Sequence, residues 1–253
     1  ASNSCTSTRH FAKGRGKTPS GASMSSSKFE GLTLLRGLRL DDEALLDRAL
    51  GLSLRSGELR DRLLHWDFGP IMEMRQRADA QNYLFSDEAV PLHWDGAFHL
   101  EPAKLLFYCT SSSGEGGETL FANTELIWSS LTEAEQRRCQ GVQLRYRTEK
   151  KAHYGGVITV PLVQRHPITN RTILRLAERV ETALNPVELE VMGVEDATGF
   201  YEDMRSKLYD PRFLIAHEWR CGDLLVCDNF TFLHGRRALG RNVDRAFKRV
   251  QIL

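Results

Sequence analysis

Three side chains that could hold a metal ion lie in two distant parts of the sequence. In Leu92-His93-Trp94-Asp95-Gly96, an imidazole and a carboxylate stand two residues apart, directly after an apolar stretch. Residues two apart in a strand project from the same face, with Cα atoms about 6 to 7 Å apart. His93 and Asp95 are therefore predicted to converge on one ion.

The third side chain is His234, at the end of the apolar run from Asp228 to Arg236. Two histidines and one carboxylate leave three coordination positions open, which is typical of non-haem iron oxygenases. Structural zinc sites more often fill their coordination sphere. An H-x-D triplet alone is weak evidence, because His and Asp also pair in loops for structural reasons, so the prediction needs further support.

That support comes from two arginines near the end of the chain. A strand from about Arg245 to Leu253 places Arg245 and Arg249 on one face, about 13 Å apart, too far to grip one carboxylate together. One guanidinium can bind the far end of an extended dicarboxylate through paired hydrogen bonds. The alternative, a solvated basic strand face, is favoured for either arginine in isolation.

With these residues in place, the sequence resembles the TauD/TfdA group of iron(II)/2-oxoglutarate dioxygenases. Their pattern is H-x-D, a later Thr, and a distal His followed by two Arg. The resemblance implies iron(II) held by two histidines and an aspartate, with 2-oxoglutarate and O2 as cosubstrates. It implies that the distal carboxylate of 2-oxoglutarate binds Thr and the first Arg, while the second Arg lies nearer the iron and binds an anion of the substrate or cosubstrate. The matching residues are His93, Asp95, Thr119 in Gly116-Gly117-Glu118-Thr119, His234, Arg245 and Arg249.

Several longer stretches resemble the PvcB-like subgroup more closely. That resemblance implies oxidation of an amino-acid-derived isonitrile in secondary metabolism, such as desaturation of tyrosine isonitrile, with or without loss of its carboxylate. The segment before Trp66 is short for the subgroup. The matching stretches are Phe68-Gly69-Pro70, Val90 to Gly96, Ala152-His153-Tyr154, Ala216 to Arg220 and Asp228 to Arg236.

Candidate substrate contacts are Arg249 for an anionic end, and His153, Tyr154 and Phe98 for an aromatic body. Each of the last three has a plainer interpretation. Tyr154 can cap a turn before two glycines, Phe98 can belong to the core, and His153 can be a solvated loop residue. His217 is expected to be a core histidine, and Asn229 to orient the turn that leads to His234.

Two other functions stay open at this point. The first is a TauD-like dioxygenase that hydroxylates another small anion, such as a sulfonate, an aryloxy acid or an amino acid. The second is a jelly-roll binding protein with a vestigial metal site, because a fold alone does not settle function.

The composition is that of a globular protein and favours a small-molecule ligand. The 253 residues are 41% hydrophobic and 26% charged, and 34 basic against 33 acidic residues give a formal charge of +1. A net charge this close to zero gives no overall electrostatic field that would favour nucleic acid as a partner. No apolar run reaches the length of a membrane span. The sequence leaves the oligomeric state open.

The elements that must position these residues are mainly strands. We expect a mainly β fold, a double-stranded β-helix (jelly roll) core with flanking helices, because many short β runs are separated by Gly, Pro and Asn. Helices are expected at Asp41 to Leu64, from the Thr132/Glu135 capping box to Arg138, and at Asp196 to Tyr209. Expected strands are 31–35, 83–85, 104–110, 141–147, 157–163, 172–176, 213–219, 223–227 and 247–253.

Residues 1–28 are expected to form a disordered basic tail, and residues 29–253 a single dioxygenase domain. The tail is rich in Ser, Gly and Thr and contains no Asp or Glu. Five scattered cysteines favour a reducing, cytoplasmic compartment. Cys221 and Cys227 could meet across a turn, but two free buried thiols are the simpler interpretation.

Overall fold

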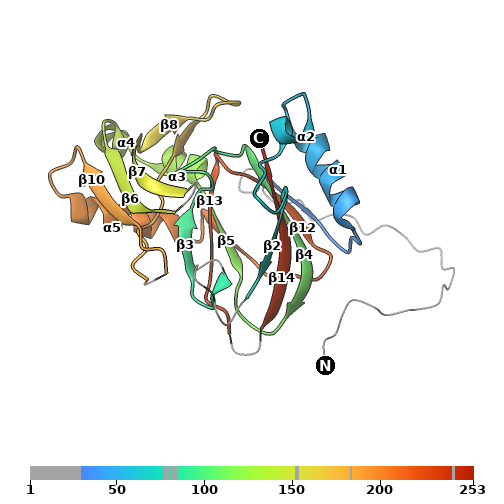
Figure 1. Ribbon diagram of the computed structural model, residues 1–253. Coiled ribbons are helices and arrows are strands. Elements are labelled where there is room, and N and C mark those ends of the chain that lie inside the picture. Colours follow the sequence, from blue (N-terminus) through green and yellow to red (C-terminus); the bar gives the residue numbers. More distant parts are fainter. Residues whose placement is uncertain (1–29, 77–79, 81–84, 152–153, 183, 241–242) are drawn as a thin grey trace, which may run out of the picture.

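The computed structural model describes residues 30–253, except 77–79, 81–84, 152–153, 183 and 241–242. Its centre is a pair of antiparallel sheets that face each other (Figure 1). The five-stranded sheet has the order β1-β12-β4-β14-β2, and the four-stranded sheet the order β11-β5-β13-β3. Their bounds are β1 Leu32–Leu35, β2 Ile71–Arg75, β3 Val90–His93, β4 Lys104–Ser113, β5 Thr119–Asn123, β11 Leu214–His217, β12 Leu224–Asp228, β13 Phe232–Arg236 and β14 Asp244–Ile252.

Large apolar side chains fill the space between these two sheets. Phe107, Cys227 and Phe247 from the five-stranded sheet belong to one buried cluster with Phe121 and Phe232 from the four-stranded sheet. Burial of apolar area of this kind is the main driving force for folding. The strands that carry the candidate site are therefore held by packing on both sides.

Helices cover the outer face of the five-stranded sheet. Leu45 and Ala49 of α1 (Asp42–Leu52) pack with Leu106, Val250 and Ile252 on that face. Helix α2 (Leu59–Arg62) follows, and a backbone hydrogen bond from Leu63 N to Leu59 O closes its end. Even-numbered residues of β14 thus face the helices, while its odd-numbered residues face the opposite sheet.

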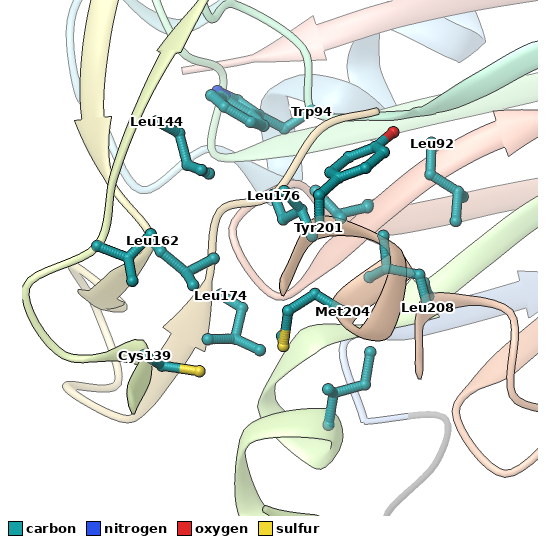
Figure 2. Packing of buried hydrophobic residues seen from close by; sticks show 14 of the residues in the cluster. Leu92, Trp94, Cys139, Leu144, Leu162, Leu174, Leu176, Tyr201, Met204 and Leu208 are labelled. Atoms are coloured by element: carbon teal, nitrogen blue, oxygen red, sulfur yellow. The ribbon is translucent and has the colours of Figure 1, made fainter. Parts of the chain in front are cut away.

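A second layer covers the outer face of the four-stranded sheet. Leu92, Leu174, Met204 and Leu208 belong to one large buried cluster there, and Figure 2 shows them packed together. The covering elements lie on the opposite side of the molecule from α1 (Figure 1). They are α3 Thr124–Ser130, α4 Glu133–Cys139, β6 Gln143–Lys151, β7 Tyr154–Pro161, β8 Val163–Arg165, β9 Thr172–Leu174, β10 Glu188–Met192 and α5 Ala197–Leu208.

The predicted fold class is confirmed, and most predicted elements are present. The Thr132/Glu135 capping box starts α4, and Asp196 caps α5. The single helix predicted from Asp41 to Leu64 is wrong. The first helix ends at Leu52 because Ser53 is extended, and Gly57 has a φ of 111° that a non-glycine residue rarely adopts.

The elements that were not predicted include β2, β5, β8, β10 and α3. β5 is buried at all five positions, so it lacks the alternation of apolar and polar residues that identifies a half-buried strand. The strand predicted at Tyr83 to Phe85 falls largely outside the described residues, as does the predicted tail.

Within the described residues, three cysteines are free and buried: Cys109, Cys139 and Cys227. The prediction of a free buried thiol is therefore correct for Cys227. It is wrong for Cys221, which is exposed and disulfide-bonded. Among the described residues, no helix is long and apolar enough to cross a membrane.

Candidate metal centre and adjoining cavities

The three predicted metal ligands lie together. β3 and β13 are neighbouring antiparallel strands, and His93 is paired with His234 across them, with ring centroids 4.3 Å apart. Asp95 follows β3 by two residues, and its Oδ1 lies 3.6 Å from His93 Nε2 and 3.7 Å from His234 Nε2. One ligand atom from each residue falls within 4.8 Å of the others.

Gly235 allows β13 to approach β3 this closely. A Cβ atom on Gly235 would lie 2.6 Å from the carbonyl oxygen of Val90. The strand register also shifts between His234 and Arg236. A side chain at position 235 would push the two histidine-bearing strands apart.

The geometry of the imidazoles fits a bound ion. Both ring nitrogens of His234 are buried, and within the described part of the chain neither has a hydrogen-bond partner. Leaving buried polar groups unpaired costs about 1 to 3 kcal/mol each, and an ion at Nε2 would remove one such cost. His93 Nδ1 lies 2.9 Å from the carbonyl oxygen of Pro91, the contact by which metal-binding histidines fix their tautomer.

The electrostatics keep His234 and Asp95 in the deprotonated state that metal binding needs. Burial, followed by the proximity of His93, lowers the pKa of His234 to about 3. Burial alone would raise the pKa of Asp95, but the Arg249 guanidinium and the two imidazoles outweigh it and hold that pKa well below its usual range. Asp95 therefore stays a carboxylate.

Asp95 is fixed by partners on both its backbone and its side chain. Asn229 is fully buried; its Oδ1 accepts from Asp95 N at 3.0 Å and its Nδ2 donates to Asp95 O at 3.0 Å. Asn229 thus holds the peptide of Asp95, whereas the sequence predicted that it orients the turn before His234. Oδ2 of the Asp95 carboxylate accepts from Gln251 Nε2 at 2.6 Å and lies 3.0 Å from Arg249.

A small basic cavity adjoins the metal ligands on one side. His93, His234, Thr119, Arg245 and Arg249 all line it. Thr119 Oγ1 accepts hydrogen bonds from Trp219 Nε1 at 2.8 Å and from Arg245 at 2.9 Å. Since both acceptor positions of this hydroxyl are used, its own proton is left to donate to a ligand.

Arg245 is held in this cavity without a carboxylate in hydrogen-bond contact among the described residues. Its guanidinium lies 4.1 Å from the centre of the Phe247 ring. Burial and then the nearby Arg236 lower the pKa of Arg245 to about 9, because a cation is costly there. A bound carboxylate would remove that cost, so the surroundings of Thr119 and Arg245 suit an anion. The predicted alignment of Arg245 and Arg249 on one face of the strand is present, since both line the same cavity.

A larger cavity of about 820 Å³ opens on the other side of the ligands. It reaches His93, Asp95 and Arg249, and its walls carry many aromatic rings. Cavities of roughly 300 to 1,000 Å³ with apolar walls and a few polar groups are usual for small-molecule ligands. The aromatic wall residues include Trp66, Phe68, Phe85, Trp94, Phe98 and Tyr154.

The predicted substrate contacts are brought together in part. Phe98 and Tyr154 both line the large cavity, and their rings meet edge to face at 5.3 Å. Burial and the charge of Asp95 raise the pKa of Tyr154, so its phenol stays a hydrogen-bond donor at neutral pH. His153 lies outside the described residues. His217 is a core histidine as predicted, 3.2 Å from Asp223 and packed on Trp219.

Sequence reasoning missed Trp66 and Gln251. Trp66 lines the large cavity and donates from Nε1 to Gln251 Oε1 at 3.2 Å. A signal for Gln251 was present, because the same alternation that aligns Arg245 with Arg249 also includes residue 251. Nothing in the sequence around Trp66 points to this contact.

Comparison with known proteins agrees with this site. The chain is 40% identical to 3-((Z)-2-isocyanoethenyl)-1H-indole synthase of Fischerella ambigua, over 76% of this chain and 73% of that protein. It is 32% identical to the tyrosine isonitrile desaturase of Pseudomonas aeruginosa, over 86% and 80%. The solved structure of PvcB, described as an Fe, alpha-ketoglutarate dependent oxygenase from an isonitrile synthetic pathway, matches with a TM-score of 0.70 at 28% identity, over 89% of this chain and 77% of PvcB.

A family model also matches residues 29–251, and its description is taurine catabolism dioxygenase TauD, TfdA family. The match covers both histidines, Asp95 and both arginines of the site. The resemblance inferred from the sequence is thereby confirmed, and with it the enzyme class and the expected dependence on iron(II), 2-oxoglutarate and O2. This chain is a member of the TauD/TfdA family of dioxygenases.

Proposed function

We propose that the protein is an iron(II)- and 2-oxoglutarate-dependent oxygenase that oxidises an aromatic isonitrile derived from an amino acid. The observation that carries the proposal is that His93, Asp95 and His234 lie where two unlike cavities meet. One cavity is small and basic, and suits a dicarboxylate. The other is large and aromatic, and suits an aromatic substrate with a single anionic group.

His93, Asp95 and His234 would hold the iron. With 2-oxoglutarate and O2 bound, the metal centre would supply the oxidising power. One oxygen atom of O2 ends in succinate as 2-oxoglutarate loses carbon dioxide, and when the substrate is desaturated the other oxygen atom leaves as water. The protein's own contribution is binding, orientation and exclusion of water. Those tasks fall to the two cavities.

Thr119 and Arg245 are proposed to bind the distal carboxylate of 2-oxoglutarate. The support is the free hydroxyl proton of Thr119 and the buried guanidinium of Arg245. A guanidinium can bind a carboxylate through two parallel hydrogen bonds, which fixes the long axis of the cosubstrate. Its other end would then point along the cavity toward His93 and His234.

Arg249 is proposed to bind an anionic group at the metal, either the substrate carboxylate or the first carboxylate of 2-oxoglutarate. It lines both cavities, is 4% exposed, and its Nε has no partner within the described part of the chain. Phe98 and Tyr154 are proposed to hold the aromatic body of the substrate, because their paired rings form part of the large cavity. His153 stays a candidate from the sequence alone.

Two substrates are favoured by specific observations. Tyrosine isonitrile is the named substrate of the desaturase relative, and an isocyanoethenyl indole is the named product of the relative with 40% identity. The cavity volume admits a phenol or an indole ring. We expect desaturation of the side chain, with or without loss of the substrate carboxylate.

The test combines spectroscopy with product analysis. Under anaerobic conditions, iron(II) and 2-oxoglutarate should give a visible charge-transfer band. With oxygen, incubation with the isonitriles of tyrosine and tryptophan should give a product lighter by two hydrogens, or by two hydrogens and carbon dioxide. Absence of the band would overturn the cofactor assignment. A band without turnover of either isonitrile, but with hydroxylation of a sulfonate, an aryloxy acid or an amino acid, would replace the substrate assignment.

The proposal also includes a reducing, cytoplasmic compartment. Three buried free thiols support it, while the disulfide-bonded Cys221 argues the other way. Counting free thiols in protein isolated under acid quench would decide between them.

A further inference from the structure

Gln251 is a buried side chain at the metal ligands to which the proposed function gives no role. It is 4% exposed, donates from Nε2 to Asp95 Oδ2, and accepts at Oε1 from Trp66 Nε1. Only one orientation of the amide satisfies both contacts. The flipped amide would set its oxygen against a carboxylate and its NH2 group against an indole N–H.

The two oxygens of Asp95 have different surroundings. Oδ1 faces the imidazoles of His93 and His234, and Oδ2 accepts from Gln251; Arg249 Nη1 contacts both oxygens, at 3.4 Å from Oδ1 and 3.0 Å from Oδ2. The hydrogen bond from Gln251 to Oδ2 opposes rotation of the carboxylate about its Cβ–Cγ bond. Oδ1 is thus the oxygen presented on the imidazole side.

Arg249 and Gln251 are not equivalent partners of Oδ2. Arg249 lines both cavities and carries a charge that an incoming anion can attract. The amide of Gln251 is neutral and already engaged at both ends. An anion that drew Arg249 away from Asp95 would leave the hydrogen bond from Gln251 to Oδ2 in place.

We propose that Gln251 is a positioning residue that keeps Asp95 with Oδ1 toward the bound metal, and that Trp66 acts through Gln251 by fixing its amide. Because Trp66 also forms part of the large cavity wall, this chain of contacts connects the substrate cavity with the metal ligands. The inference rests on the proposed function, since it takes a divalent ion to lie among His93, Asp95 and His234.

The test measures metal affinity directly, without turnover. Metal-free protein is titrated anaerobically with Mn(II), and free Mn(II) is followed by electron paramagnetic resonance. Gln251→Met keeps the length of the side chain but removes the donor, and Trp66→Phe removes one N–H while keeping a ring. Loss of such outer contacts to a metal ligand lowers metal affinity by about 10- to 100-fold. We expect a loss of that size for Gln251→Met and a smaller one for Trp66→Phe.

The double variant distinguishes positioning from general damage. If Trp66 acts through Gln251, the double variant with Gln251→Met and Trp66→Phe should have the same Mn(II) affinity as Gln251→Met alone. The reason is that the effects of substitutions at contacting residues in one network do not add. Trp128→Phe is the matched control: Trp128 packs against the large hydrophobic cluster, and its variant should bind Mn(II) as the wild type does.

Wild-type affinity in Gln251→Met, or additive losses in the double variant, would overturn the inference while leaving the proposed function intact. If thermal unfolding shows that Gln251→Met does not fold, Trp66→Phe decides, and unchanged Mn(II) affinity in that variant overturns the role of the network. A wild-type protein that binds no Mn(II) would overturn the proposed function itself.

Discussion

The two cavities that meet at His93 and Arg249 are built from different kinds of structure. Thr119, His234 and Arg245 in the basic cavity lie on β5, β13 and β14, strands of the two facing sheets. The aromatic cavity takes Trp66 and Phe68 from the connection between α2 and β2, and Phe98 from the segment after β3. Sheet strands form the basic side, whereas the aromatic side combines connecting segments with strand residues such as Tyr154 of β7 and Gln251 of β14.

This difference separates a rigid part of the site from an adaptable one. Strand residues are held by backbone hydrogen bonds and by packing on two faces, so their spacing is set by the sheet. Connecting segments tolerate changes in length and sequence far better. Variants on the two sides should therefore affect different kinetic constants, and the following variants test that separation, in order of decreasing effect.

The largest effect is expected at the metal ligands, which serve both cavities. Asp95→Ala and His234→Ala should abolish the charge-transfer band with iron(II) and 2-oxoglutarate, because each variant removes one of the three protein ligands proposed for the ion. Anaerobic absorption spectroscopy measures this. Retention of the band in either variant would remove that residue from the ligand set.

The next largest effect is expected on the basic side. Arg245→Met should raise the KM for 2-oxoglutarate roughly 100-fold or more, because leaving a buried carboxylate unpaired costs about 3 to 5 kcal/mol. The KM for the isonitrile should change little. Lys248→Met is the matched control, since Lys248 lies on the opposite face of β14 and pairs with Asp42. An unchanged KM for 2-oxoglutarate in Arg245→Met would show that the distal carboxylate binds elsewhere.

A smaller effect with the opposite pattern is expected on the aromatic side. Phe98→Ala removes one aromatic ring from the wall of the large cavity, and a contact between that ring and an aromatic substrate is worth about 0.5 to 1.5 kcal/mol. The KM for the aromatic isonitrile should rise about 2- to 12-fold, and the KM for 2-oxoglutarate should stay constant. Tyr154→Phe keeps the ring pair and serves as the conservative comparison. A parallel rise in both KM values would contradict the separation of the two sides.

The smallest effect concerns stability at alkaline pH. Burial raises the pKa of Cys139 to about 11 from an ordinary value of 9.0. The thiol ionises at a lower pH in the unfolded chain than in the folded protein. The contribution of the buried thiol to the free energy of unfolding is therefore complete below pH 9 and is lost as the pH rises toward 11. The free energy of unfolding should therefore fall less steeply with pH in Cys139→Ala than in wild type. Equal slopes, measured by denaturant titration from pH 8 to 11, would contradict this.

The same contrast between the two cavities explains what the sequence could predict. His93, Asp95, Thr119, His234, Arg245 and Arg249 were identified because their spacing along strands translates directly into shared faces, and because the family resemblance supplied their order. The break after Leu52 was not foreseen, since the leucine spacing is helical on both sides of Ser53 and only the local backbone ends the helix.

Contacts between connecting segments and the core were not predictable in the same way. Trp66 meets Gln251, and Asn229 holds the peptide of Asp95, through partners far away in the chain. No periodicity encodes such pairs, because they depend on how finished elements pack together. Phe98 and Tyr154 were named from the sequence only as separate candidates for the aromatic body of the substrate, and their contact with each other became visible only in the fold.

The alternation of β14 has a consequence for how this enzyme can change over generations. Arg245, Arg249 and Gln251 share one face of a single strand, while Val250 and Ile252 on the other face pack with α1. Deletion of one residue between 245 and 249 would turn Arg249 and Gln251 toward α1 and Val250 toward the opposite sheet at the same time. Insertions and deletions are therefore expected to be tolerated around Phe68 and Phe98 and eliminated in β14, so that new substrates are acquired while the use of 2-oxoglutarate is inherited unchanged.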